Sequence, residues 1–68
     1  MPEVIFIIVL HFTVMGYSGR ALPSDAAHRK AFVEQSDCRK AIPAVRRALA
    51  SSPVAPDRIV CERMEIMK

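Results

Sequence analysis

The sequence lacks the residue patterns that are typical of most catalytic and metal-binding sites. Its 68 residues include only two glycines and two cysteines, which leaves no glycine-rich phosphate loop and no paired-cysteine zinc knuckle. The spacings of His11, His28 and the two cysteines match no common zinc site, and no nucleophile motif is present. The acidic residues are scattered along the chain and do not form the pairs used in acid–base catalysis. We therefore expect a protein that is not an enzyme and that needs neither a cofactor nor a metal ion.

Aromatic residues are also scarce, at 6% of the chain, and they are not interleaved with the basic residues. The net charge is +3, and four basic residues share one predicted helix: Arg39, Lys40, Arg46 and Arg47. These are the candidate contacts for an anion, either a nucleic-acid phosphate or an anionic membrane surface. A solvated helix face accounts for them equally well, and base-stacking aromatic residues are missing, so we do not expect nucleic-acid binding.

The chain has no apolar run long enough to cross a membrane, but it is organised around a shorter one at residues 4–10. A membrane span needs about 20 apolar residues, whereas this run is interrupted at His11 and closed by Arg20. Most of its residues are β-branched, which favours a strand over a helix. We predict a strand over residues 4–15. The alternative is a signal peptide or membrane anchor over residues 4–17, followed by a small helical domain.

The clearest helical periodicity lies in residues 37–50. Their apolar positions recur along one stripe of a helix, at Cys38, Ile42, Val45 and Leu49. Ser36 is the predicted N-cap, and Asp37 in the first turn suits the positive end of the helix dipole. Pro43 falls inside this segment, so one kinked helix and two short helices both remain open.

The remaining segments predict two loops and two further strands. Gly16 and Gly19 place a loop over residues 16–29, and Pro53 with Pro56 ends the helix. The pair Phe32-Val33 predicts a strand over residues 30–35, although a helix capped by Ser24 stays open for residues 26–30. Alternating apolar positions predict another strand over residues 58–64. The whole chain, residues 1–68, then forms one small α+β domain, a ββαβ unit whose helix packs on a short sheet.

In this arrangement, Cys38 on the helix and Cys61 on the last strand both point into the layer between helix and sheet. A disulfide between them would stabilise the fold by roughly 3 kcal/mol in the chain-entropy model, provided that the compartment is oxidising. Two separate buried thiols are the alternative. A paired Cys38 and Cys61 would indicate a periplasmic, secreted or membrane-associated protein.

A single helix covers only one face of a sheet, and this bears on partners. Side chains alternate along a strand, so Ile5, Ile7 and Val9 point to one face and a second set points to the other. We predict the second set as the partner-facing surface: Val4, Phe6, Ile8 and Leu10. Because a chain this short is marginally stable alone, we expect a homo-oligomer or a protein partner, with a membrane as the alternative.

The order of short motifs along the chain resembles a group of very short uncharacterised proteins encoded in bacteriophage and prophage genomes. The shared pattern runs over most of the chain: His11-Phe12-Thr13, Phe32-Val33-Glu34, Ser36-Asp37-Cys38 and Ile59-Val60-Cys61. The resemblance implies a small disulfide-linked α+β unit of unknown role, without catalytic residues. Pro43 and the long connection over residues 16–27 depart from that pattern. The main hypothesis is a non-enzymatic interaction module, and the alternative is a membrane-targeted or exported accessory protein of the phage type.

Overall fold

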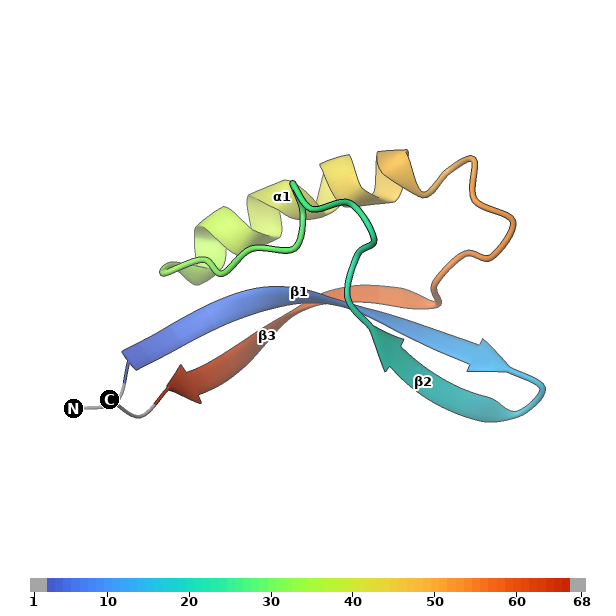
Figure 1. The fold of residues 1–68 in the computed structure, drawn as a ribbon, viewed down its shortest axis with the longest axis horizontal. Helices are drawn as coiled ribbons and strands as arrows, with labels where there is room; N and C mark the ends of the chain where they lie inside the picture. Colours follow the sequence, from blue (N-terminus) through green and yellow to red (C-terminus); the bar gives the residue numbers. More distant parts are fainter. Residues whose placement is uncertain (1–2, 67–68) are drawn as a thin grey trace.

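The longest strand is β1, Glu3–Val14, which is the central strand of a three-stranded antiparallel sheet with the order β2-β1-β3. The computed structural model describes residues 3–66. Strands β2, Tyr17–Ala21, and β3, Arg58–Ile66, flank β1, and helix α1, Gln35–Ala48, lies along one face of the sheet (Figure 1). The predicted α+β class is confirmed, and its apolar N-terminal segment is a strand. Within residues 3–66, no helix has the length and apolar character needed to cross a membrane.

β1 is central because it is paired along both of its sides. Glu3 to His11 pair with β3, and Leu10 to Val14 pair with β2. A strand in this position has few free backbone groups, and its unbroken apolar run is typical of a strand that is sheltered on both faces. The apolar run at residues 4–10 therefore lies in the central strand of the sheet, as the sequence predicts.

The second strand lies where the sequence predicted a loop. β2 occupies Tyr17–Ala21, inside the segment 16–29, and a two-residue turn at Met15 and Gly16 joins it to β1. Both turn residues have positive φ angles, 52° for Met15 and 85° for Gly16. This backbone geometry matches the twist of a β-hairpin, and glycine adopts it without steric cost. Gly19, the second predicted loop signal, is a strand residue opposite Phe12.

The predicted strand over residues 30–35 is reduced to one bridge. Phe32 exchanges two backbone hydrogen bonds with Phe6, each 2.8 Å between nitrogen and oxygen. This bridge lies on the side of β1 that faces β2, beyond the point at which β2 ends. Val33 is 75% exposed, so the pair Phe32-Val33 contributes one packed residue and not a half-buried strand.

Helix α1 begins at Gln35 and continues through Pro43 as one helix, to Ala48. Glu34 occupies the N-cap position and makes no side-chain capping bond, so the predicted Ser36 cap is wrong. Asp37 does lie in the first turn, as predicted. Pro43 is on the exposed side of the helix, where its ring does not displace core side chains.

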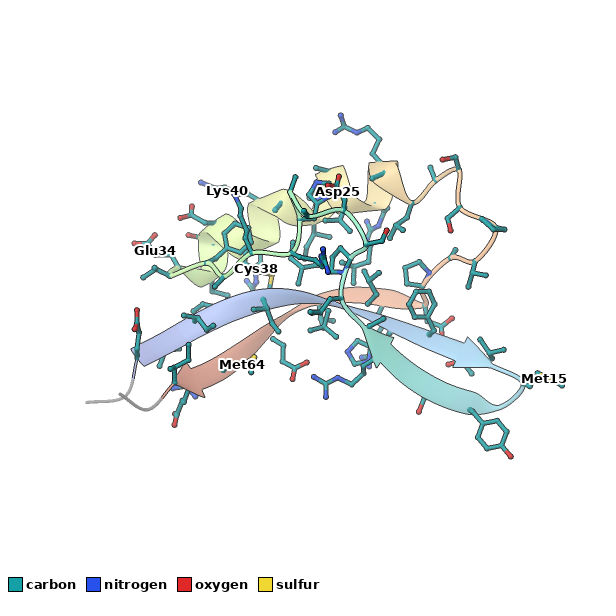
Figure 2. All side chains as sticks on the ribbon, viewed as in Figure 1. Met15, Asp25, Glu34, Cys38, Lys40 and Met64 are labelled. Atoms are coloured by element: carbon teal, nitrogen blue, oxygen red, sulfur yellow. A yellow bond between two sulfur atoms is a disulfide. The ribbon has the colours of Figure 1, made fainter. Side chains whose placement is uncertain are left out.

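The core lies between α1 and the sheet. Its buried members are Ile8, Leu10, Cys38 and Val45, with partly buried side chains around them: Phe6, Phe12, Phe32, Ala41, Leu49, Ile59 and Cys61. The predicted disulfide joins Cys38 of α1 to Cys61 of β3, with 6.1 Å between their Cα atoms and a sequence separation of 23. Figure 2 shows Cys38 on the side of α1 that faces the sheet. A small apolar core and one covalent link therefore hold the helix in place.

Candidate protein-interaction surface

The two faces of β1 are assigned the opposite way from the sequence prediction. Ile8 is 1% exposed and Leu10 is 3% exposed, because both point at α1 and belong to the core. Phe6 packs against the same core, and Val4 is half-buried nearer the start of the strand. Alternation shows which side chains share a face but not which face receives the helix, so the prediction of these four as partner-facing is wrong.

The face of the sheet opposite α1, which we call the open face, carries the other set of β1 side chains. Ile5 and Ile7 are half-buried there, and they lie beside the β3 residues Met64 and Ile66, which are 44% and 40% exposed. The register places Ile5 opposite Met64. Figure 2 shows Met64 on the side of the sheet away from α1. We call Ile5, Ile7, Met64 and Ile66 the apolar end of the open face.

The other part of the open face is sheltered by an ion pair. Arg20 of β2 lies opposite His11, and Glu62 of β3 lies opposite Ile7. Their side chains meet in a salt bridge, which must cross over the β1 residue between those positions, Val9. Val9 is only 3% exposed although no helix covers it. Long charged side chains commonly cover apolar surface with their methylene groups, and an arginine stem that crosses over Val9 is consistent with this low exposure.

β3 is an edge strand, and its outer side faces no other strand among residues 3–66. Phe6 directs its backbone groups away from β3, towards Phe32, so the odd-numbered residues of β1 direct theirs towards β3. Their partners are the even-numbered residues of β3. The outward-facing N–H and C=O groups of the edge therefore belong to the odd-numbered residues: Ile59, Cys61, Arg63 and Glu65.

Two charged side chains stand on this edge. Arg63 and Glu65 form a salt bridge with 3.0 Å between nitrogen and oxygen, and their side chains are 58% and 51% exposed. An exposed pair of this kind contributes little to the stability of the monomer, in the range of about 0–1 kcal/mol. Charged residues on an edge strand also limit uncontrolled pairing with other chains. These two side chains therefore govern which strands can lie beside β3.

The predicted anion-contacting residues are spread along the outside of α1. Arg39, Lys40, Arg46 and Arg47 are all exposed, and within residues 3–66 none of them is part of a salt bridge. Figure 2 shows Lys40 directed away from the sheet. Arg46 and Arg47 lie in the last turn, where positive charge is favourable at the negative end of the helix dipole. Anion binding by these four residues stays a prediction.

The histidines and cysteines are not brought together. Cys38 and Cys61 are joined to each other, and the Nδ1 atom of His28 lies 3.4 Å from the carboxylate of Asp25. The part of the chain that the structure describes contains no group of three or more side chains that could hold a metal ion.

Sequence reasoning missed Met64 and Ile66. The alternation in residues 58–64 put Cys61 on the helix side, which already implied that the even-numbered residues of this strand point the other way. Ile66 lay beyond the predicted end of that strand.

No protein-family model, no curated protein and no solved structure matches this chain. The resemblance to short phage proteins therefore stays a prediction. The surface formed by the apolar end and the β3 edge is the feature of the molecule that points to a function.

Proposed function

We propose that this protein is a small interaction module that self-associates through the apolar end of the open face and the adjoining edge of β3. One observation carries the proposal. Met64 and Ile66 remain 44% and 40% exposed beside half-buried Ile5 and Ile7, on a sheet face that no other described element covers. Apolar surface on a rigid sheet next to unpaired backbone groups is typical of a site that receives another strand.

A second exposed apolar group lies at the tip of the β1–β2 hairpin. Val14, Met15 and Tyr17 are 56%, 92% and 81% exposed. Val14 and Tyr17 pair with each other in the hairpin, and Met15 lies in the turn between them. β2 is the other edge of the sheet, but it has only five residues, whereas β3 has nine and ends beside the apolar end of the open face. This difference favours the β3 region as the binding surface.

Recognition by an added strand divides the binding energy in a simple way. Main-chain hydrogen bonds to the edge supply affinity without regard to sequence, and alternate side chains supply specificity. A strand placed beside β3 would set every second side chain next to Met64 and Ile66 on the open face. Hydrophobic contact there would add roughly 25 cal/mol for each Å² of apolar surface removed from water.

The experiment is sedimentation velocity on the intact, oxidised chain over a wide concentration range. We expect the sedimentation coefficient of the wild type to rise with concentration. Met64→Lys should lower the association constant by about tenfold or more, because it places a charge in the apolar end. Met15→Lys is the matched control, since it makes the same chemical change at a more exposed methionine, and it should behave as the wild type.

Two results would contradict the proposal. A wild-type sedimentation coefficient that does not change with concentration would show that the chain does not self-associate. Equal losses in Met64→Lys and Met15→Lys would show that association follows general hydrophobicity or the hairpin tip instead of the β3 region.

A further inference from the structure

The outer edge of β3 can pair with its own copy in several antiparallel registers, and one of them brings opposite charges together while it also joins the two apolar ends. We infer that two copies of this chain pair β3 with β3 about a two-fold axis at Met64, so that the two three-stranded sheets become one continuous sheet. This inference rests on the proposed self-association and specifies its geometry.

Backbone geometry restricts the possible registers. The outward-facing N–H and C=O groups belong to odd-numbered residues of β3, so odd-numbered residues of one copy must lie opposite odd-numbered residues of the other. In a symmetric antiparallel pair, the two-fold axis then passes at one residue of β3, and that residue lies opposite its own copy. Five registers satisfy this condition and pair at least five residues of β3, with axes at Val60, Cys61, Glu62, Arg63 and Met64.

Charge separates these registers. Centring at Glu62 sets this residue opposite its own copy, and centring at Arg63 does the same for arginine. Centring at Cys61 sets Glu65 opposite the second copy's Asp57, which is also acidic. Like charges directly opposite each other on neighbouring strands are destabilising. Each of these three registers therefore brings two like charges together. Centring at Val60 instead sets Arg58 opposite Glu62, but it leaves Met64 and Ile66 outside the paired segment, so it does not join the apolar ends.

The register centred at Met64 reverses this situation. It sets Arg63 of each copy opposite Glu65 of the other, which gives two cross-strand pairs of opposite charge. Arg63 and Glu65 already bond to each other within one chain, but both side chains are more than half exposed, so exchanging partners costs little. The charges on the edge then favour this register over those centred at Cys61, Glu62 and Arg63, and the position of the apolar ends favours it over the one centred at Val60.

The same register joins the apolar ends of the two copies. Met64 of one copy lies beside Met64 of the other on the open face, and Ile66 lies opposite Glu62. The paired segment is short, residues 62–66, and buries less than the roughly 1,200 Å² that a stable interface usually needs. We expect weak and rapidly exchanging dimers, with a dissociation constant above about 1 μM.

A charge-exchange experiment tests this register directly. Arg63→Glu leaves only acidic side chains at the two positions, and Glu65→Arg leaves only basic ones, so each variant should repel its own copies. We expect each to associate about tenfold or more weakly than the wild type. An equimolar mixture of the two variants should associate as well as the wild type, because every pair then has opposite charges. The double variant Arg63→Glu with Glu65→Arg should also self-associate normally.

The outcomes separate this inference from the proposed function. If the wild type self-associates and the single variants do so equally, or if the mixture gives no recovery, the register is wrong and the interaction module stands. If the wild type is monomeric, both are wrong. Both side chains are exposed, so the fold should persist, and circular dichroism with non-reducing intact mass checks it. Should a reversal impair folding, Arg63→Gln and Glu65→Gln should each show a smaller loss, and unchanged association in both would contradict the register.

Discussion

β1 has apolar side chains on both of its faces, and the two faces are buried by different means. On the helix side, Ile8 and Leu10 are covered by apolar side chains of α1, which the disulfide ties to β3. On the open face, Val9 is covered by a partly exposed ion pair, and Ile5 and Ile7 are only half-buried. The helix side thus contributes most of the stability of the fold, while apolar side chains on the open face stay accessible to a partner.

The largest effect should come from shortening matched side chains on the two faces. Ile8→Ala leaves a cavity in the core and should lower the free energy of unfolding by about 4 kcal/mol. Ile7→Ala removes the same atoms from the neighbouring, half-buried position and should cost about 1 kcal/mol. Urea unfolding followed by circular dichroism measures both values.

An equal loss in the free energy of unfolding for both variants would contradict the difference between the two faces. Should Ile8→Ala fail to fold, Ile8→Val and Ile7→Val provide a milder pair. We then expect a loss of about 1 kcal/mol at Ile8 and a smaller loss at Ile7.

The covalent link should account for the next largest effect. Reduction of the disulfide between Cys38 and Cys61 should lower the free energy of unfolding by about 3 kcal/mol, because the unfolded chain regains the freedom that the closed loop removes. The double variant Cys38→Ala with Cys61→Ala removes the bond without a reductant and should unfold at a similarly low urea concentration. An unchanged unfolding midpoint in both would show that apolar packing alone holds α1 on the sheet.

The parts of the fold that the sequence predicted correctly have strong periodic signals. The apolar run of β1 and the stripe of α1 each extend over many residues, and Cys38 and Val45 are buried where the stripe placed them. β2 was missed because all five of its residues are exposed, so no alternation between buried and exposed side chains marks it. Its turn also has methionine at a positive φ angle, and no common hairpin sequence signal contains methionine there.

The candidate surface was less predictable than the fold. Both sets of side chains on β1 are apolar, so composition could not distinguish the helix side from the open face. That choice follows from pairing: Cys61 must face Cys38, and Ile8 lies opposite Cys61 in the register. The register is a property of the folded sheet and of its turn, and a single sequence does not display it. The edge position of β3 is likewise known only once the strand order is known.

The smallest effect should come from the ion pair on the open face. Arg20→Ala and Glu62→Ala should each lower the free energy of unfolding by about 0.5 kcal/mol, because the pair is partly exposed and also shelters Val9. The control is the pair Arg63 and Glu65, which lies on the edge strand and whose side chains are 58% and 51% exposed. Double-mutant cycles should give a larger coupling energy for Arg20 with Glu62 than for the control pair, and about 1 M NaCl should weaken the Coulomb part of both. Because burial of Val9 by the arginine stem does not depend on salt, part of the coupling between Arg20 and Glu62 should persist at high ionic strength. Equal coupling in the two pairs would mean that the open face shelters Val9 by some other contact, and the contrast between the two faces of β1 would need a different cause.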